Sequence, residues 1–289
     1  MGNFKETPFN ELTFGIIGLG LIGGSYARAL RELGVRRILG LDRSRGIANA
    51  CRSAHLVDEL IGQDGSGMEE ADVVICCIYP GDLYGFLEER KGHLRPGALV
   101  TDVSGIKDDM PRKIQAMLPA GVEFISGHPM AGRQGSGLGM SDASIFDGAN
   151  YIIVPTEENS SEAIVWMTEF AERLGCGNTV QISGEEHDRI IAYTSNLPHL
   201  LAVSLLNSRS FDESTKQFIA GSFRDATRVA DINPELWKDL FLGNRENVLQ
   251  EIDNFREQLD CWEKLLRDND GEGLTKIMEE AAEKSRRLY

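Results

Sequence analysis

Short apolar runs alternate with helical patterns through the first two thirds of the chain. The run ADVVICCIY at 71–79 is almost continuously apolar, which is typical of a parallel strand buried on both faces, and Pro80 ends it. The pattern predicts strands at 12–19, 36–42, 71–79, 97–103, 122–127, 150–155 and 178–183, and helices at 22–33, 44–53, 108–118 and 160–174. Strands that alternate with helices predict βαβ units and a parallel sheet.

The pattern changes after Ser183, beyond which no clear strand pattern follows. Residues 185–208 are predicted to form a long helix that is kinked at Pro198. Between Val248 and Leu266, apolar residues recur at steps of three and four, which predicts one apolar face of another long helix. The sequence therefore predicts an α/β domain over 1–183 and an all-helical domain over 184–289, whose apolar faces a second copy would cover in a homodimer.

Composition and charge narrow the classes of partner. A content of 42% hydrophobic and 26% charged residues is ordinary for a soluble globular protein. The formal net charge of −15 opposes binding to nucleic acid and to anionic membranes. An anionic substrate would therefore need a local pocket of basic residues.

Location and metal binding are predicted from what the sequence lacks. No apolar run reaches the length of about 18 residues that a membrane helix needs, and MGNFKETPFNEL does not have the pattern of a signal peptide. The five cysteines form no CxxC pair, so we expect a reduced, cytoplasmic protein. No spacing of histidines, cysteines or carboxylates suggests a metal site.

A glycine-rich turn follows the first predicted strand and opens the first predicted helix. Its residues are Gly18, Leu19, Gly20, Leu21, Ile22 and Gly23. This GxGxxG pattern permits a tight turn, close approach of a pyrophosphate and close packing of helix on strand, with the phosphates at the helix N-terminus.

Asp42 ends the second predicted strand, 19 residues after Gly23, where a carboxylate can bind both ribose hydroxyls. Together with the glycine-rich turn it predicts a Rossmann-type dinucleotide site. The charge of Asp42 favours NAD over NADP, although Arg43 and Arg45 would suit a 2′-phosphate. The alternative role for Asp42 is a helix N-cap, for which Ser44 is better placed.

The segment GHPMAG at 127–132 lies at the C-terminal end of a predicted strand, at the sheet edge where such folds carry ligands. A histidine at this edge, His128, can accept a hydroxyl proton while a hydride leaves the same carbon. Taken alone, a structural histidine in a loop is an equally good interpretation.

Several motifs in one order resemble a known family. GLGLIGGS (18–25), GHPMAG (127–132), LPHLLA (197–202), FRDATRVA (223–230) and NPELWKDLFLGNRENV (233–248) occur in the order and rough spacing seen in prephenate and arogenate dehydrogenases. The resemblance runs from about residue 12 to residue 266. It implies a Rossmann-type domain, a helical substrate and dimerisation domain, and NAD as cofactor.

The resemblance also implies roles for single residues. His128 matches the histidine that accepts the proton of the ring hydroxyl, His199 a histidine in the substrate pocket, Arg228 an arginine that binds a substrate carboxylate, and Trp237 a tryptophan at the pocket rim. The nicotinamide is expected near Tyr79, Ser104 and Gly127, with Lys107, Arg133 and Arg224 as supports for the substrate. From the residues alone, Arg228 also suits a surface ion pair with Asp225 or Asp231, and His199 a buried position satisfied by the backbone.

Two positions depart from the family pattern. The family often has Asp-x-Gly-Ser-x-Lys after the fifth strand, whereas this chain has Ser104 and Gly105 in exchanged order, so Gly105 occupies the place of the active-site serine. Ser104 is a candidate replacement from one residue earlier. Gln134 stands where some members carry an acidic residue linked to control by tyrosine.

The activity that the resemblance implies is NAD-dependent oxidative decarboxylation of prephenate to 4-hydroxyphenylpyruvate. Three alternatives are kept: arogenate as the substrate, another β-hydroxyacid or imine oxidoreductase on the same plan, and a non-catalytic NAD-binding module. His55, His93 and His187 lie in polar stretches, and the sequence predicts no role for them.

Overall fold

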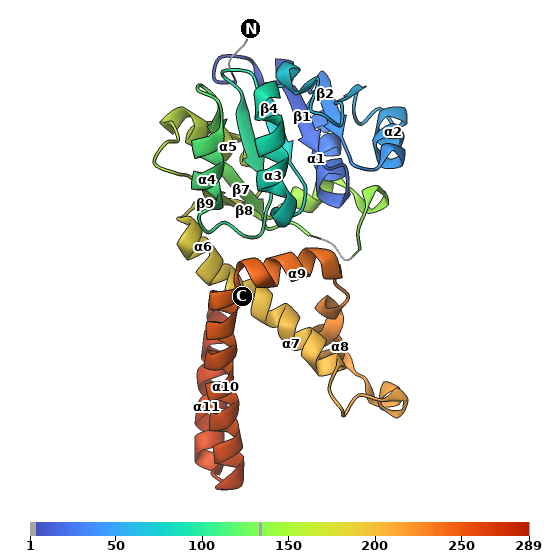
Figure 1. Cartoon of the computed structure of the whole chain (residues 1–289). Helices are drawn as coiled ribbons and strands as arrows, with labels where there is room; N and C mark the ends of the chain where they lie inside the picture. The colour runs from blue at the N-terminus through green and yellow to red at the C-terminus, as the bar shows by residue number, and fades with distance from the viewer. Residues whose placement is uncertain (1–3, 133–134, 289) are drawn as a thin grey trace. The chain divides into compact units, whose positions relative to one another are not determined.

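The computed structural model describes residues 4–132 and 135–288. The chain divides into two compact units, one that ends at Asn244 and one that begins at Arg245 (Figure 1). The predicted boundary at residue 183 marks a different division, the change from strands to helices, and it stays a prediction.

A six-stranded parallel sheet forms the core of the first unit. Its strand order is β3-β2-β1-β4-β5-β6. The strands are β1 (Thr13–Ile17), β2 (Arg37–Leu41), β3 (Glu59–Leu60), β4 (Val73–Cys76), β5 (Leu99–Asp102) and β6 (Glu123–Phe124). The order reverses direction between β1 and β4, which in doubly wound folds opens a crevice for ligands at the carboxyl ends of the strands. The predicted Rossmann-type parallel sheet is thereby confirmed.

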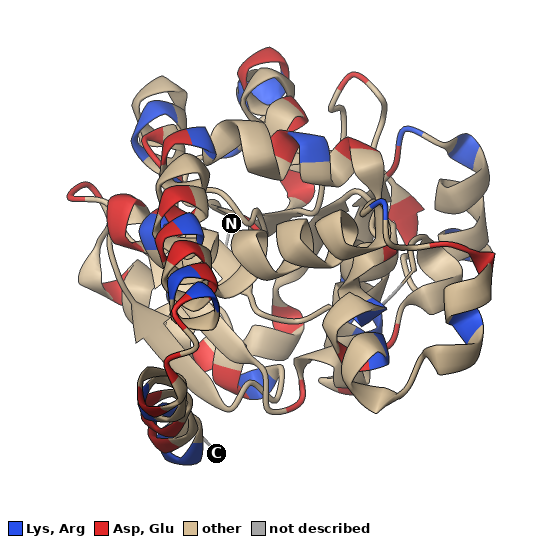
Figure 2. Cartoon of the chain, turned by 90° about the horizontal axis from the view of Figure 1, so that it is seen from below, with Lys and Arg blue, Asp and Glu red and all other residues tan. Residues whose placement is uncertain are grey.

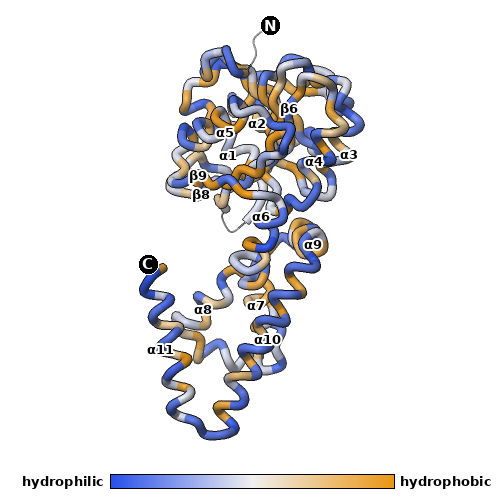
Figure 3. Tube along the Cα trace, turned by 90° about the vertical axis from the view of Figure 1, so that its left-hand side faces the viewer, coloured by the Kyte–Doolittle hydropathy of each residue, from blue (hydrophilic) through white to orange (hydrophobic). Residues whose placement is uncertain are grey.

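Helices cover both faces of this sheet. One core cluster joins β1 to α1 (Leu21–Glu32), α2 (Arg45–Ser53) and α5 (Ser161–Arg173), and the other joins the sheet to α3 (Pro80–Arg90) and α4 (Met110–Met117). Figure 3 shows hydrophobic stretches of the chain inside the first unit, among its helices. The neighbours Cys76 and Cys77 pack into opposite clusters, as the alternation along a strand requires.

A second, three-stranded sheet holds β7 (Ser126–Pro129), β8 (Asn150–Val154) and β9 (Asn178–Gln181). β7 pairs antiparallel with β8, and β8 pairs parallel with β9. The single strand predicted at 122–127 was wrong, because β6 and β7 belong to different sheets. Hydrophobic pattern reports which residues are buried, but it does not report which strand they pair with.

α3 is a helix that the sequence analysis did not predict. Pro80 was interpreted only as the end of a strand, but it is the first residue of α3. Proline suits that position, because its missing N–H is one that the first turn of a helix leaves unpaired anyway.

The helix predicted at 185–208 is interrupted one turn before Pro198. α6 (Gly184–Ile191) passes through a π-helical segment (Ala192–Asn196) into α7 (Leu197–Leu206). A proline removes one backbone donor, and the wider π turn accommodates the carbonyl that loses it. α8 (Gly221–Thr227), a 3₁₀ turn (Arg228–Ala230) and α9 (Pro234–Gly243) complete the first unit.

The second unit is a pair of helices, α10 (Arg245–Arg267) and α11 (Gly271–Leu288), which contact each other. Figure 2 shows acidic and basic residues interspersed along them, and ion pairs one turn apart, such as Arg256–Asp253 and Arg267–Glu263, account for part of this pattern. Leu259 and Leu266 on the predicted apolar stripe are 53% and 63% exposed.

Short 3₁₀ segments lie at Phe9–Glu11, Met68–Glu70, Lys91–His93, Leu138–Met140, Ala143–Phe146 and Glu213–Phe218. Among the described residues, no helix combines the length and apolar character needed to cross a membrane.

Candidate active site

The glycine-rich turn between β1 and α1 has the backbone that its sequence predicts. Gly18 adopts a φ of +88°, and a Cβ there would lie 2.5 Å from the carbonyl oxygen of Cys77. A Cβ on Gly23 would lie 1.8 Å from the carbonyl oxygen of Gly18. A Cβ on Gly20 would meet no described atom within 4 Å. Two glycines therefore close the turn, while the third leaves open space at the N-terminus of α1, which suits a pyrophosphate.

Asp42 is buried directly after β2 and faces this turn. Its Oδ2 accepts a hydrogen bond of 2.8 Å from the backbone N–H of Leu19, and its Oδ1 accepts one of 2.8 Å from the N–H of Ser44. The N-cap of α2 is Ser44, whose side chain accepts from the N–H of Ile47. Asp42 is thus tied to the glycine-rich turn itself, and the residues present fit a dinucleotide.

Tyr79 lies between β4 and α3, near two polar partners. The guanidinium of Arg43 lies 5.9 Å from the centre of its ring, and the side-chain amide of Asn233 donates a hydrogen bond of 2.8 Å to its hydroxyl. Tyr79 therefore links the end of β4 to the start of α9.

Lys107 is wholly buried, in contrast to the substrate contact predicted for it. Its ammonium donates to Oδ2 of Asp102 at 2.9 Å and to the carbonyl of Gly127 at 2.7 Å. Burial lowers the pKa of Lys107, and the carboxylate of Asp102 opposes that shift. Because both contacts are internal, Lys107 joins the end of β5 to β7 and presents its charge to the loop around His128.

Ser104 has internal hydrogen bonds, and its catalytic role stays a prediction. Its hydroxyl donates to the carbonyl of Ile106 at 3.0 Å and accepts from the N–H of the same residue at 3.2 Å. The neighbouring position points elsewhere: a Cβ on Gly105 would lie 3.7 Å from Nε2 of His128. The exchange of serine and glycine therefore leaves the position beside His128 without a side chain and moves the hydroxyl into the turn.

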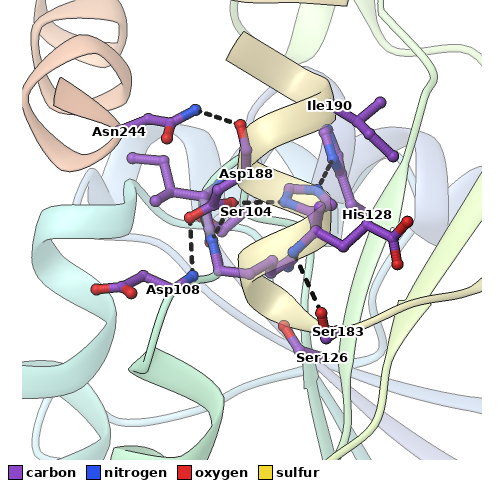
Figure 4. Close-up of polar contacts among 12 residues, drawn as sticks. Ser104, Asp108, Ser126, His128, Ser183, Asp188, Ile190 and Asn244 are labelled. Atoms are coloured by element: carbon purple, nitrogen blue, oxygen red, sulfur yellow. Dashed lines mark hydrogen bonds and ion pairs between the residues drawn. The ribbon is translucent and has the colours of Figure 1, made fainter. Parts of the chain in front are cut away.

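His128 stands in β7, opposite Ile152, and keeps part of its side chain accessible. Its Nδ1 lies 2.9 Å from Nε2 of His187, whose Nδ1 lies 2.6 Å from Oδ1 of Asp188 (Figure 4). Burial, the ammonium of Lys107 and the neighbouring imidazole together hold the pKa of His128 well below its ordinary value. His128 is therefore neutral near pH 7, as a general base must be.

His187 and Asp188 are site residues that the sequence analysis missed. Both are almost completely buried, at 0% and 3% exposure, although they stand in a polar stretch at the start of α6. A weak signal was available, because His187 precedes the buried Ile191 by four residues and so shares its face of the helix.

His199, Trp237 and Arg228 form a second group. The rings of His199 and Trp237 lie 3.9 Å apart at their centres, and Nδ1 of His199 donates to the carbonyl of Ser195 at 2.8 Å. Burial lowers the pKa of His199, and the nearby guanidinium of Arg228 lowers it further. Arg228 itself is exposed, on the 3₁₀ turn after α8. The structure thus gathers three of the predicted substrate residues.

α9 relates this group to the end of the sheet. Leu240 of α9 lies 3.2 Å from the position of a Cβ on Gly105, the residue beside His128, and Trp237 is one turn earlier on the same helix. That the side chains of His128 and Arg228 face one cleft stays a prediction. Arg133, predicted to support the substrate, and Gln134, which the sequence analysis related to control by tyrosine, fall outside the described residues.

The fold and the glycine-rich turn define a class, the Rossmann-type dinucleotide-binding proteins. Within the described residues, no cluster of three or more histidine, cysteine or carboxylate side chains is placed to hold a metal ion.

The family follows from comparison with known proteins. Residues 26–180 match the model of the prephenate dehydrogenase nucleotide-binding domain, and residues 183–280 match that of the prephenate dehydrogenase dimerization domain. The chain belongs to the prephenate dehydrogenase family. The predicted resemblance is thereby confirmed.

The alignments with two curated relatives cover most of the chain. Prephenate dehydrogenase of Bacillus subtilis is 31% identical over 92% of this chain and 73% of its own length. Cyclohexadienyl dehydrogenase of Zymomonas mobilis is 31% identical over 92% of each chain. Among solved structures, prephenate dehydrogenase from A. aeolicus in complex with hydroxyphenyl propionate and NAD+ gives a TM-score of 0.87 at 25% identity, over 96% of this chain and 98% of that one. Arogenate dehydrogenase of Synechocystis gives 0.81 at 27% identity, over 96% of this chain and 100% of that one.

Proposed function

We propose that this chain is an NAD-dependent prephenate dehydrogenase, which converts prephenate to 4-hydroxyphenylpyruvate and carbon dioxide. The observation that carries the proposal is the imidazole of His128, which lies 2.9 Å from that of His187, in the same unit as the open turn at Gly20. A non-catalytic NAD-binding module would have no need for a buried network behind such a histidine.

The residues of the chain divide the chemical work. When bound, NAD+ would accept the hydride, and the carboxylate of Asp42 and the N-terminus of α1 would hold its ribose and phosphates. His128 would accept the proton of the ring hydroxyl as the hydride leaves that carbon. Loss of the ring carboxylate as carbon dioxide makes the ring aromatic, which makes the step irreversible.

His128 holds the hydroxyl proton during this reaction, and the overall reaction neither consumes nor releases a proton. Prephenate carries two carboxylates, and the product carries one, so charge balances between NAD+ and NADH without a net proton. His128 therefore returns its proton to the phenolate oxygen as the product forms. A base of low pKa suits this task, because it releases the proton readily.

Arg228 would bind a carboxylate of the substrate, and His199 would line the pocket beside it. A guanidinium binds a carboxylate through two parallel hydrogen bonds, and this provides the local positive charge that a chain of net charge −15 needs. His199 donates its Nδ1 hydrogen to Ser195, so its Nε2 is an acceptor in the neutral form.

One assay tests the proposal. The purified chain is given prephenate or arogenate, each with NAD+ or NADP+, and formation of the reduced nicotinamide is followed by absorbance. We expect the highest kcat/KM with prephenate and NAD+. A higher kcat/KM with arogenate would make the chain an arogenate dehydrogenase, and no turnover with either substrate would refute both activities.

His128→Asn tests the assignment of the base. The asparagine keeps a polar group of similar size but cannot accept the proton, so we expect kcat to fall by roughly 100-fold or more. The Kd for NAD+, measured by fluorescence titration, should change little. An unchanged kcat would refute the assignment of His128.

We also propose that the enzyme is a homodimer formed through its helical part. Apolar residues are exposed along the predicted stripe of α10, and Leu205 on α7 is 43% exposed. Exposed apolar surface of this kind is covered by a second copy in many symmetric dimers. The cytoplasmic location expected from the five cysteines stays a prediction.

A further inference from the structure

We propose that His187 is a positioning residue: backed by Asp188, it holds His128 in the tautomer whose Nε2 is free to accept a proton. The inference rests on the proposed function, because it concerns how the base His128 is prepared. It assigns a task to the more deeply buried of the two histidines in this network.

The carboxylate of Asp188 is surrounded by donors. Its Oδ1 accepts from the backbone N–H of Lys107 at 2.9 Å, and its Oδ2 accepts from the N–H of Asp108 at 2.8 Å. Backbone N–H groups can only donate, so Asp188 is fixed as an acceptor. The contact of 2.6 Å between its Oδ1 and Nδ1 of His187 must therefore be donated by the imidazole.

This first assignment determines the next one. A neutral imidazole carries one hydrogen, so His187 with hydrogen on Nδ1 has a bare Nε2. That atom lies 2.9 Å from Nδ1 of His128, which must then be the donor. His128 consequently has its hydrogen on Nδ1 and a lone pair on Nε2. The two hydrogen bonds that join Asp188, His187 and His128 thus have the same donor-to-acceptor direction, and this direction sets which ring nitrogen of His128 is bare.

The surroundings allow few alternatives to this order. His187 is wholly buried, so water cannot replace either of its partners. The side-chain amide of Asn244 donates to the backbone carbonyl of Asp188 at 2.8 Å and to the side chain of Asn196 at 3.1 Å, which holds this turn of α6 in place (Figure 4).

The charged groups around the pair favour a neutral His128 at rest. The ammonium of Lys107 opposes a positive charge on either ring, and it is itself paired with Asp102. When His128 accepts a proton, the carboxylate of Asp188 stabilises the added charge through His187, as the aspartate of a serine protease does for its histidine.

The residue beside this nitrogen has no side chain. A Cβ on Gly105 would lie 3.7 Å from Nε2 of His128 and 3.2 Å from a methyl group of Leu240, so a larger residue would crowd the ring on that side. The network therefore fixes which nitrogen accepts, and Gly105 adds no side chain against it.

The tautomer can be measured directly in the wild-type protein. With ¹⁵N-labelled histidine, two-bond ¹H–¹⁵N spectra at pH 7.5 distinguish a protonated ring nitrogen from a bare one. We expect His128 to show a protonated Nδ1 and a bare Nε2, and His187 to show the same. The spectrum of His128→Asn, which lacks one set of signals, assigns the peaks. A protonated Nε2 on His128 overturns the inference.

A pair of substitutions tests the consequence for catalysis. His187→Gln keeps the order of contacts, because its amide can donate to Asp188 while its oxygen accepts from His128. His187→Leu has a similar size but cannot accept. We expect kcat to fall about 100-fold or more in the leucine variant and to stay within about tenfold of wild type in the glutamine variant, with the Kd for NAD+ unchanged in both.

Each outcome has one meaning. Equal losses in the two variants, or no loss in the leucine variant, overturn the positioning role. If neither variant folds, as judged by circular dichroism, the wild-type spectrum decides. A wild-type chain that turns over none of the substrates refutes the proposed function, whereas an active chain whose His128 carries hydrogen on Nε2 refutes this inference alone.

Discussion

Three histidines of the first unit share a lowered pKa but differ in their neighbours. His187 is enclosed between an imidazole and a carboxylate, His128 keeps one accessible side, and His199 stacks against Trp237. Burial is the largest cause of the lowered pKa in all three. The same side chain is thus prepared as a base, as a support or as a polar wall of a pocket by the groups that touch it.

Arg228→Ala tests the substrate contact at the scale of one residue. The variant loses the guanidinium that would bind a carboxylate, so we expect the KM for prephenate to rise about tenfold or more, with a smaller effect on kcat. Steady-state kinetics at saturating NAD+ measure both.

Arg224→Ala is the matched control for this experiment. Arg224 is also exposed and stands one turn earlier, on α8. Arg224 was predicted only as a support for the substrate, so its replacement should leave KM within about twofold of wild type, since a solvent-exposed charge contributes little unless its geometry is fixed. Equal rises in KM would mean that net charge, and not the position of Arg228, controls binding. If Arg228→Ala lowered only the melting temperature, the guanidinium would be a structural ion-pair partner.

Among the elements, two junctions position the site. The turn from β1 to α1 places Gly20 at the N-terminus of a helix, and the π-helical segment before α7 ends one residue before Leu197 and two before Pro198. Both are interruptions of regular structure: no side chain caps the start of α1, and His199 donates to the carbonyl of Ser195 in the π-helical segment. Such interruptions concentrate where a ligand needs access to the backbone or to a side chain.

The glycine-rich turn gives a prediction with a built-in control. Gly23→Ala would force a Cβ into the carbonyl of Gly18, so we expect a loss of stability of about 1–3 kcal/mol in urea unfolding. Gly20→Ala meets no described atom within 4 Å, so its stability should stay within about 0.5 kcal/mol of wild type.

Binding of NAD+ should distinguish the two variants in the opposite order. Gly20→Ala places a methyl group where the pyrophosphate would approach the backbone, so we expect the Kd for NAD+ to rise about tenfold or more. Fluorescence titration of both variants measures it. A Gly20→Ala variant that binds NAD+ as tightly as wild type would show that the phosphates lie elsewhere.

For the whole molecule, three partly or wholly buried histidines affect how the free energy of unfolding depends on pH. The folded-state pKa values of His128, His187 and His199 all lie below 6.5, the ordinary value. As pH falls below 6.5, the unfolded chain binds protons that the folded chain does not, so the free energy of unfolding decreases. Above that pH all three are neutral in both states, and their contribution is constant.

We therefore expect the urea concentration at the midpoint of unfolding to decrease as the pH is lowered from 7.5 to 5.5. His187→Gln removes one of the three groups and should show a shallower dependence on pH, whatever its absolute stability. The measurement is urea unfolding followed by circular dichroism at four pH values in that range. A midpoint that rises on acidification would contradict the depressed pKa values.

Association of two chains is the second prediction at this scale. Leu259→Glu places a charge on the exposed apolar stripe of α10, and we expect the dimer to dissociate with a Kd raised about 100-fold or more. Gln258→Glu adds the same charge next to the stripe and should leave the Kd within about threefold of wild type. Analytical ultracentrifugation over a range of concentrations measures both. A wild-type chain that is monomeric at every concentration would rule out the homodimer.

Local patterns in the sequence determined much of this protein. Runs such as 71–79 and the glycine spacing at 18–23 predicted the strands and the dinucleotide turn, because strand burial and tight turns depend on residues close together in the chain. The same locality explains why most helix and strand ends were predicted to within a few residues. The motifs around His128, His199 and Arg228 were recognisable for the same reason.

Contacts between distant segments were decided only by the tertiary structure. The pairing of β6 with β5 and of β7 with β8, the hydrogen bond from Lys107 to Gly127, and the contact of His128 with His187 join segments that lie apart in sequence. A polar residue has the same local pattern whether it faces water or a buried partner, so the sequence predicted no role for His187. The proton-accepting nitrogen of His128 is selected by those long-range hydrogen bonds, since a tautomer depends on what each ring nitrogen touches and not on the neighbours along the chain.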